Sequence, residues 1–271
     1  MLFRSLQGVR FLPDGQRGWV VGHDGTVLAT ADGGKTWNSQ PSGTSAGLRG
    51  IAFLDDGQRG WAVGDMGAVR VTADGGRSWL AQPSTTTAQL QSVTFLSDGQ
   101  RGWAVGDMGT VLATADGGKT WVPQSSGTSA GLRGMAFLAD GQRGWAVGSG
   151  GTVLATADAG RTWGVQTSGT SAGLQAVTFL PDGQRGWAVG HEGAVLTTVD
   201  GGQRWEETAL YEVLWPPWYL AVLTLGGLVL ALLIGFARPV RGPPRDERDR
   251  PLAGGATTLV SDEPVSDKAR D

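Results

Sequence analysis

The stretch "TADGGKTW", residues 30–37, decides the fold, because the chain repeats it four more times with small changes. The later copies are "TADGGRSW" from residue 72, "TADGGKTW" from 114, "TADAGRTW" from 156 and "TVDGGQRW" from 198. Successive copies start 42 residues apart, and a fixed period of this length is the signature of a repeat architecture. A catalytic site is asymmetric and needs one copy of its motif, so we interpret the repeated Asp, Gly and Trp as a structural device.

The composition limits the classes of protein that the chain can belong to. Its net charge of −3 gives no general attraction to nucleic acid, and we expect no nucleic-acid partner. The absence of Cys excludes disulfides, thiolate metal sites and a Cys nucleophile. The sequence contains no P-loop, catalytic triad or zinc motif, so we predict neither a cofactor nor a metal site.

Each repeat reads as four short strands joined by turns. In the second repeat the expected strands are 48–54, 61–64, 68–73 and 79–82, and "DDGQRG", "DMG" and "DGGRS" separate them. Gly and Asp stand where hairpins require positive φ angles. The strands are apolar or small on both faces, as "TVLATA" shows, which is typical of a sheet covered on both sides. The pattern predicts an all-β fold, a β-propeller of five four-stranded blades.

The repeats set the expected domain boundaries. The propeller takes residues 1–208, a linker 209–213, an apolar segment 214–237 and a charged tail 238–271. The five blades are expected at about 6–47, 48–89, 90–131, 132–173 and 174–208.

The repeated turn resembles the Asp-box, also called the bacterial neuraminidase repeat. The longer pattern GW[AV]VGxxG[TA]VLxTxDGGKTW is similar to the photosystem II stability and assembly factor family, from Leu6 to Thr208. The resemblance implies a non-enzymatic propeller that binds a membrane-protein partner during assembly, although members usually have seven blades. The residues that match the Asp-box are Asp32, Trp37, Asp74, Trp79, Asp116, Trp121, Asp158, Trp163, Asp200 and Trp205.

The segment 214–237 is expected to be a single transmembrane helix. It holds 24 residues without a charge, begins with an aromatic cluster and is followed by five Arg between residues 238 and 250. The positive-inside rule places the tail in the cytoplasm and the propeller outside. Export requires a signal, so we expect the true start to lie upstream of Met1; the alternative is a cytoplasmic propeller. The tail has the composition of a disordered segment.

Small residues four positions apart give the apolar segment one candidate dimer face, formed by Gly227, Ala231 and Gly235.

Two faces of the propeller are candidate binding surfaces. The turns after the first and third strands of each blade gather basic residues on one face, expected to meet an acidic partner protein or else to pair locally with neighbouring Asp residues. These basic residues are Arg17, Arg59, Arg101, Arg143, Arg185, Lys35, Arg77, Lys119 and Arg161. On the opposite face lie the turns between the second and third strands, which we call the tips. Their sequences differ between blades, and binding specificity tends to lie where loops vary on a fixed scaffold. The candidate tip residues are His23, Asp65, Asp107, His191 and Glu192.

The alternatives to a binding module are a glycan-binding or sialidase-like protein and a transmembrane sensor. A sialidase uses a Tyr nucleophile with a Glu partner, yet the repeats contain no Tyr before Tyr211. No unique pair of carboxylates stands out for glycosidase chemistry, and the tail holds no output domain. We therefore predict a non-enzymatic, membrane-anchored module that binds a protein.

Overall fold

The computed structural model describes residues 5–208, all of them within the first of two compact units, 1–216. These residues form five antiparallel sheets, each of four strands in sequence order. The prediction of five four-stranded propeller blades is confirmed. The segment 214–237, its dimer face and the tail 238–271 lie outside the described residues. Within 5–208, no helix has the length and apolar character needed to cross a bilayer.

The strands of the five blades follow one scheme of inner, two middle and outer strands. Blade 1 holds β1 (Leu6–Phe11), β2 (Gly18–Gly22), β3 (Val27–Thr30) and β4 (Asn38–Gln40). Blade 2 holds β5 (Leu48–Phe53), β6 (Gly60–Gly64), β7 (Val69–Thr72) and β8 (Leu80–Gln82). Blade 3 holds β9 (Leu90–Phe95), β10 (Gly102–Gly106), β11 (Val111–Thr114) and β12 (Val122–Gln124). Blade 4 holds β13 (Leu132–Phe137), β14 (Gly144–Gly148), β15 (Val153–Thr156) and β16 (Gly164–Gln166). Blade 5 holds β17 (Leu174–Phe179), β18 (Gly186–Gly190), β19 (Val195–Thr198) and β20 (Glu206–Glu207).

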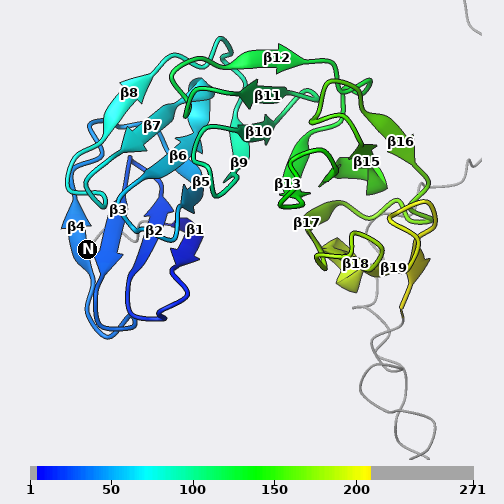
Figure 1. The fold of residues 1–271 in the computed structure, drawn as a ribbon, viewed down its shortest axis with the longest axis horizontal. Helices are drawn as coiled ribbons and strands as arrows, with labels where there is room; N and C mark the ends of the chain where they lie inside the picture. The colour runs from blue at the N-terminus through cyan, green and yellow to red at the C-terminus, as the bar shows by residue number, and fades with distance from the viewer. Residues whose placement is uncertain (1–4, 209–271) are drawn as a thin grey trace, which may run out of the picture. The chain divides into compact units, whose positions relative to one another are not determined.

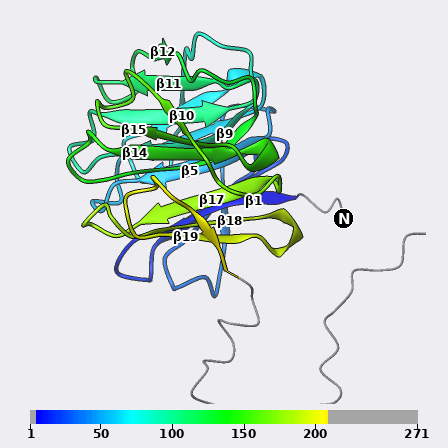
Figure 2. The same ribbon diagram turned by 90° about the vertical axis from the view of Figure 1, so that its right-hand side faces the viewer.

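The blades follow one another along an arc, with the inner strands on its inside and the outer strands on its outside (Figure 1). Seen from the side, strands of successive blades run in roughly the same direction (Figure 2). The second strand of each of the first four blades is buried at all five positions. In blades 2–4 such a strand has paired neighbours on both edges and a blade on each face, so no side of it meets water, which explains why these strands are apolar throughout.

Tight turns at the tips join the second and third strands. At the first tip Asp24 and Gly25 have φ angles of 54° and 64°, and two successive positive φ values define the turn that suits a two-residue hairpin. At the second tip the amide of Asp65 donates to the Gly47 carbonyl at 2.8 Å, so this tip lies beside the loop that leads into its own blade. The other two turns of each blade share the opposite edge, where the amide of Gly33 donates to Gln16 at 2.9 Å. This arrangement agrees with the two faces inferred from the sequence.

Aromatic side chains join each blade to the next. Trp19 of blade 1 stacks on Phe53 of blade 2, with ring centroids 3.7 Å apart and planes 8° apart. Phe53 also meets the edge of Trp79 at 5.9 Å. The indole Nε1 of Trp19 donates to the carbonyl of Gly75, in the Asp-box turn of blade 2, at 3.0 Å. The same stack and hydrogen bond recur at the three other interfaces between described blades.

The two ends of the arc are uncovered in this unit. Trp187 of blade 5 is 39% exposed, whereas its equivalents in blades 1–4 are 1–3% exposed. Val9 of blade 1 is 63% exposed, whereas Val93, Met135 and Val177 are 7–9% exposed. The described blades therefore form an open arc and not a closed ring (Figure 1).

Candidate functional site: a polar groove along the inner strands

The Asp-box carboxylates are hydrogen-bonded within their own turns, as Asp32 shows. The Asp32 carboxylate accepts hydrogen bonds from the Thr36 hydroxyl at 2.6 Å, the Thr36 amide at 2.9 Å and the Thr30 hydroxyl at 2.8 Å. These bonds, the Thr36 hydroxyl first, lower the pKa of Asp32 to about 2. The Thr30 hydroxyl in turn accepts from the amide of Gly34 at 3.0 Å. A carboxylate held in this way closes a turn and has little capacity left to bind a ligand.

The Arg residues that follow the first strand of each blade are paired locally. Arg17 Nε donates to Asp14 at 3.1 Å, and its Nη1 lies 3.4 Å from the carbonyl of Asp56 in the next blade. The Asp14 carboxylate also accepts two amides of its own turn, and together these contacts lower its pKa. The corresponding pairs are Arg59–Asp56, Arg101–Asp98, Arg143–Asp140 and Arg185–Asp182.

The other four basic residues of this face remain available. Lys35, Arg77, Lys119 and Arg161 are exposed and form no ion pair within residues 5–208. The structure therefore divides the nine basic residues predicted on this face into five with an intramolecular role and four without one. Whether this face binds a partner stays a prediction.

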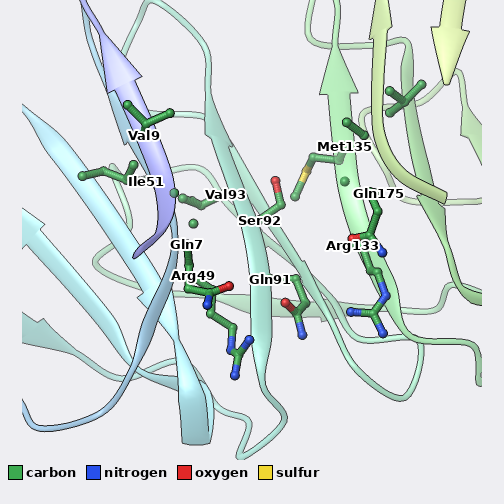
Figure 3. Close-up of a pocket in the computed structure, with 15 residues that line it drawn as sticks. Gln7, Val9, Arg49, Ile51, Gln91, Ser92, Val93, Arg133, Met135 and Gln175 are labelled. Carbon is green, nitrogen blue, oxygen red and sulfur yellow. The ribbon is translucent and has the colours of Figure 1, made fainter. Parts of the chain in front are cut away.

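A groove of about 370 Å³ runs along the inside of the arc and is lined by all five inner strands (Figure 3). Three positions of each strand line it, and they are polar, small and apolar in turn. The polar row, as we name it, consists of Gln7, Arg49, Gln91, Arg133 and Gln175. Figure 3 shows Arg49, Gln91 and Arg133 at one level of the groove, apart from the apolar Val9, Ile51 and Val93.

A β-bulge presents each residue of the polar row. In blade 2 the register passes from Leu48–Gly64 to Gly50–Val63, so Arg49 is left without a partner across the strands. The same skip occurs at Gln7, Gln91, Arg133 and Gln175. Bulges bend a strand and redirect a side chain, and here they bring the polar row to the tip that follows 16 residues later.

Four of the five polar-row residues bind the tip of their own blade. Arg49 pairs with Asp65 at 2.8 Å, and Gln89 of the next blade donates to the same carboxylate at 2.6 Å. Burial raises the pKa of Asp65, but the hydrogen bonds from Arg49 and Gln89 outweigh it and the pKa is lowered overall. The remaining contacts are Gln7–His23 at 3.2 Å, Gln91–Asp107 at 3.3 Å and Gln175–His191 at 2.6 Å.

Arg133 is the exception in the polar row. The tip residue that faces it is Ser149, where blades 2 and 3 have Asp, and Arg133 forms no ion pair or hydrogen bond within residues 5–208. Gln89 lies 24 residues after Asp65, and the residue 24 positions after Ser149 is Gly173, so the second side chain that holds the Asp65 carboxylate has no counterpart in blade 4. Blade 4 therefore presents the half-buried Arg133 in the groove without a carboxylate partner such as Asp65 in blade 2.

The tip residues predicted from the sequence do not gather into one site. His23 and His191 belong to opposite ends of the arc (Figure 1), and each binds the Gln of its own blade. Within residues 5–208 no group of three or more His, Asp or Glu could hold a metal ion. Glu192 takes the first positive-φ position of its tip, at 58°. Asp65 and Asp107 do lie beside the groove, as partners of the polar row.

Sequence reasoning missed the polar row. The signal was present, because Arg49 and Asp65 stand 16 residues apart and Arg133 and Ser149 repeat that spacing with the acid removed.

A family model agrees with the repeat pattern. The model described as photosynthesis system II assembly factor YCF48 matches residues 4–79, 42–126 and 123–228, which together cover most of the chain. The chain belongs to this family. The resemblance inferred from the sequence is thereby confirmed, and protein assembly is the role shown at the level of the family. No curated protein matches the chain.

Several solved structures are similar to the chain. A YCF48 bound to D1 peptide is 24% identical over 76% of this chain and 82% of that chain, with a TM-score of 0.45. YCF48 from Cyanidioschyzon merolae is 19% identical over 76% and 85%, also with a TM-score of 0.45. A GH74 enzyme from Niastella koreensis is 14% identical over 74% of this chain but 38% of its own, with a TM-score of 0.61. This chain thus spans well under half the length of that enzyme, and the likeness shows the fold alone.

Proposed function

We propose that this chain is a non-enzymatic assembly or stability factor that binds a carboxylate-bearing segment of a partner protein in the groove along the inner strands. The observation that carries the proposal is the unpaired Arg133. In blade 2 the equivalent Arg49 is neutralised by Asp65 at 2.8 Å. A carboxylate of a partner protein would pair with Arg133 in the way that Asp65 of the same chain pairs with Arg49.

The groove favours an extended segment over a small molecule. It is shallow and open, and its polar groups follow one another from blade to blade in a row. The amides of Gln91 and Gln175 flank Arg133 on the neighbouring strands. Hydrogen bonds to a charged group contribute about 1.5–3 kcal/mol each, so the guanidinium would anchor a segment that the flanking amides position.

The chemistry of the groove argues against the glycosidase alternative. Hydrolysis of a glycosidic bond by the usual mechanism needs two carboxyl groups on either side of the bond. The residues that line the groove in the described blades are Gln, Arg, Gly, Ser, Ala, Met and aliphatic side chains. The carboxylates of Asp65 and Asp107 beside the groove are held by Arg49, Gln89 and Gln91. The Asp-box carboxylates are held within their turns and lie at the other edge of the blades.

We further propose that residues 214–237 anchor the propeller to a membrane, with the tail 238–271 in the cytoplasm and the propeller on the other side. The length and apolar character of the segment and the five Arg that follow it support this arrangement. Single Cys substitutions at Ser42 and Ser261, labelled in intact cells with a membrane-impermeant maleimide, test it. Labelling at Ser261 alone would contradict the orientation.

The groove is tested with two substitutions copied from sister blades. Arg133→Gln installs the residue of blades 1, 3 and 5, and Ser149→Asp installs the acid of blades 2 and 3, so both are compatible with the fold. The probe is a fluorescein-labelled peptide rich in Glu, and binding is followed by fluorescence anisotropy at low salt. We expect each substitution to weaken binding about tenfold or more, because each removes the free positive charge.

Two controls make this experiment decisive. Lys35→Gln removes a charge from the opposite edge and should leave the affinity unchanged, and a Lys-rich peptide of equal length should not bind. Equal weakening by Lys35→Gln and Arg133→Gln would reduce the effect to overall charge and would contradict a site at Arg133. A photoreactive residue in place of Gln175 would crosslink the natural partner in cells. Loss of this crosslink in Ser149→Asp would extend the result to that partner.

A further inference from the structure

The exposed face of blade 5 is one half of an interface that occurs four times in this chain. At the internal interfaces a Trp of the earlier blade stacks on a Phe and donates its indole N–H to an Asp-box carbonyl of the later blade. Trp187 occupies this position in blade 5 and has neither contact within residues 5–208. Val189 beside it is 43% exposed, whereas Val21, Val63, Val105 and Val147 are fully buried.

The exposed face of blade 1 is the other half of the same interface. Phe11 occupies the position of Phe53, Phe95, Phe137 and Phe179, each of which stacks on a Trp of the preceding blade, but Phe11 has only the edge contact with Trp37. The carbonyl of Gly33 corresponds to that of Gly75, which accepts the indole of Trp19. Leu6 is 52% exposed, and its four equivalents are completely buried.

Polar groups at the two faces are complementary as well. Arg17, Arg101 and Arg143 each reach a backbone carbonyl of the next blade, at Asp56, Asp140 and Asp182. Arg185 of blade 5, the last of the described blades, keeps its pair with Asp182 but reaches no further carbonyl within residues 5–208. Its side chain is 58% exposed, against 38–40% for the others. The carbonyl of Asp14 in blade 1 is the corresponding acceptor.

We propose that two copies of this chain associate head to tail, with the exposed face of blade 5 of one copy packed on the exposed face of blade 1 of the other. The new contact would repeat the four internal ones, with Trp187 stacked on Phe11 and its indole N–H donating to the Gly33 carbonyl. A second copy fits because it carries every group that the internal interfaces use. Exposed apolar faces of this kind mark sites of protein association.

The contact is heterologous, because it joins two different surfaces. A pair of copies therefore keeps one unused blade 1 face and one unused blade 5 face, on different copies, unless the assembly closes on itself. This property gives the proposal a test that neither a symmetric dimer nor non-specific adhesion could pass.

The test uses the full chain in a mild detergent, with its mass followed by light scattering over a concentration series. We expect particles of two or more copies, and we expect Trp187→Glu and Val9→Glu each to yield the monomer, since each spoils one of the two faces. Val199→Glu is the matched control: Val199 is 77% exposed in the Asp-box turn of blade 5, and its substitution should leave the mass unchanged.

Mixing the two variants decides the geometry. The Val9→Glu chain keeps an unaltered blade 5 face, and the Trp187→Glu chain keeps an unaltered blade 1 face. These two faces can pack on each other, so the mixture should form a one-to-one dimer. A monomer at every concentration of the unaltered chain would overturn the proposal. So would association that survives Trp187→Glu, or a mixture of the two variants that stays monomeric. Val9 also lines the groove, whereas Trp187 does not, so Trp187→Glu tests the contact and Arg133→Gln tests the groove independently of each other.

Discussion

Two adjacent glycines in the tip of blade 4 offer a sharp test of the turn geometry. Gly150 and Gly151 have φ angles of 63° and 69°, so Ala meets the same left-handed backbone at both positions. That conformation costs an L residue about 1–2 kcal/mol, and the lower entropy of the unfolded chain returns about 0.4–1 kcal/mol. The surroundings differ, because a Cβ at Gly150 meets no atom within 4 Å, whereas a Cβ at Gly151 would lie 1.9 Å from the carbonyl oxygen of Thr170.

The expected effects follow from this difference. Gly150→Ala should lower the free energy of unfolding by about 1 kcal/mol, the conformational cost alone. Gly151→Ala must also displace a backbone carbonyl that accepts the Ser168 hydroxyl at 3.1 Å, and overpacking of this kind adds about 1–3 kcal/mol. We expect a total loss of about 3 kcal/mol for Gly151→Ala.

Urea unfolding monitored by Trp fluorescence measures both variants against the unaltered chain. At a common slope, the shift in midpoint gives the difference in stability. Free energies of unfolding for the two variants that agree within about 0.5 kcal/mol would refute the reasoning. The backbone angle would then account for the whole effect, and the close approach to the Thr170 carbonyl for none of it.

Three further results are expected. Trp103→Phe should lower the free energy of unfolding in urea by about 1 kcal/mol, because it loses the indole hydrogen bond to the next blade. Trp187→Phe, measured in dilute protein, should lower it by less than half of that. Equal losses would contradict the exposed face of blade 5. The pKa of Asp116 is lowered from 3.8 to about 2, first by the hydroxyl that donates to it, so its contribution is complete above about pH 4 and is lost as the pH falls toward 2. The melting temperature should therefore fall over this range, and less steeply in Asp116→Asn, which is already destabilised at pH 7; identical pH profiles would argue against a stabilising carboxylate. Ser149→Asp should raise stability by at most about 1 kcal/mol through a new ion pair with Arg133, and the gain should vanish in 1 M salt.

The blades could be predicted from the sequence because their determinants are local. The Asp-box holds Asp32, Thr36 and Gly34 within a few residues of one another, and their hydrogen bonds close inside the turn. Glycine at positive φ fixes the hairpins in the same way. A 42-residue period then repeats one local solution five times.

The features that the sequence did not reveal depend on contacts between distant residues. The stack of Trp19 on Phe53 joins residues of different blades, and the periodic Phe gave no sign of its partner. The open arc depends on how each blade packs on the next at four interfaces, and the sequence of one repeat does not show this packing. The state of Arg133 depends on a bulge that brings it to Ser149, so only the register of the strands distinguishes it from the paired Arg49.

The contacts between blades also bear on how such a chain changes its length in evolution. Each blade attaches to its successor through the same Trp, Phe and carbonyl groups, so a duplication or deletion of one 42-residue unit leaves every remaining junction chemically intact. Stability in such an array is close to a sum over units and neighbouring pairs. Recombination between nearly identical repeats can therefore add or remove a blade without requiring compensating mutations elsewhere. The number of blades can then change by one in a single event on which selection acts.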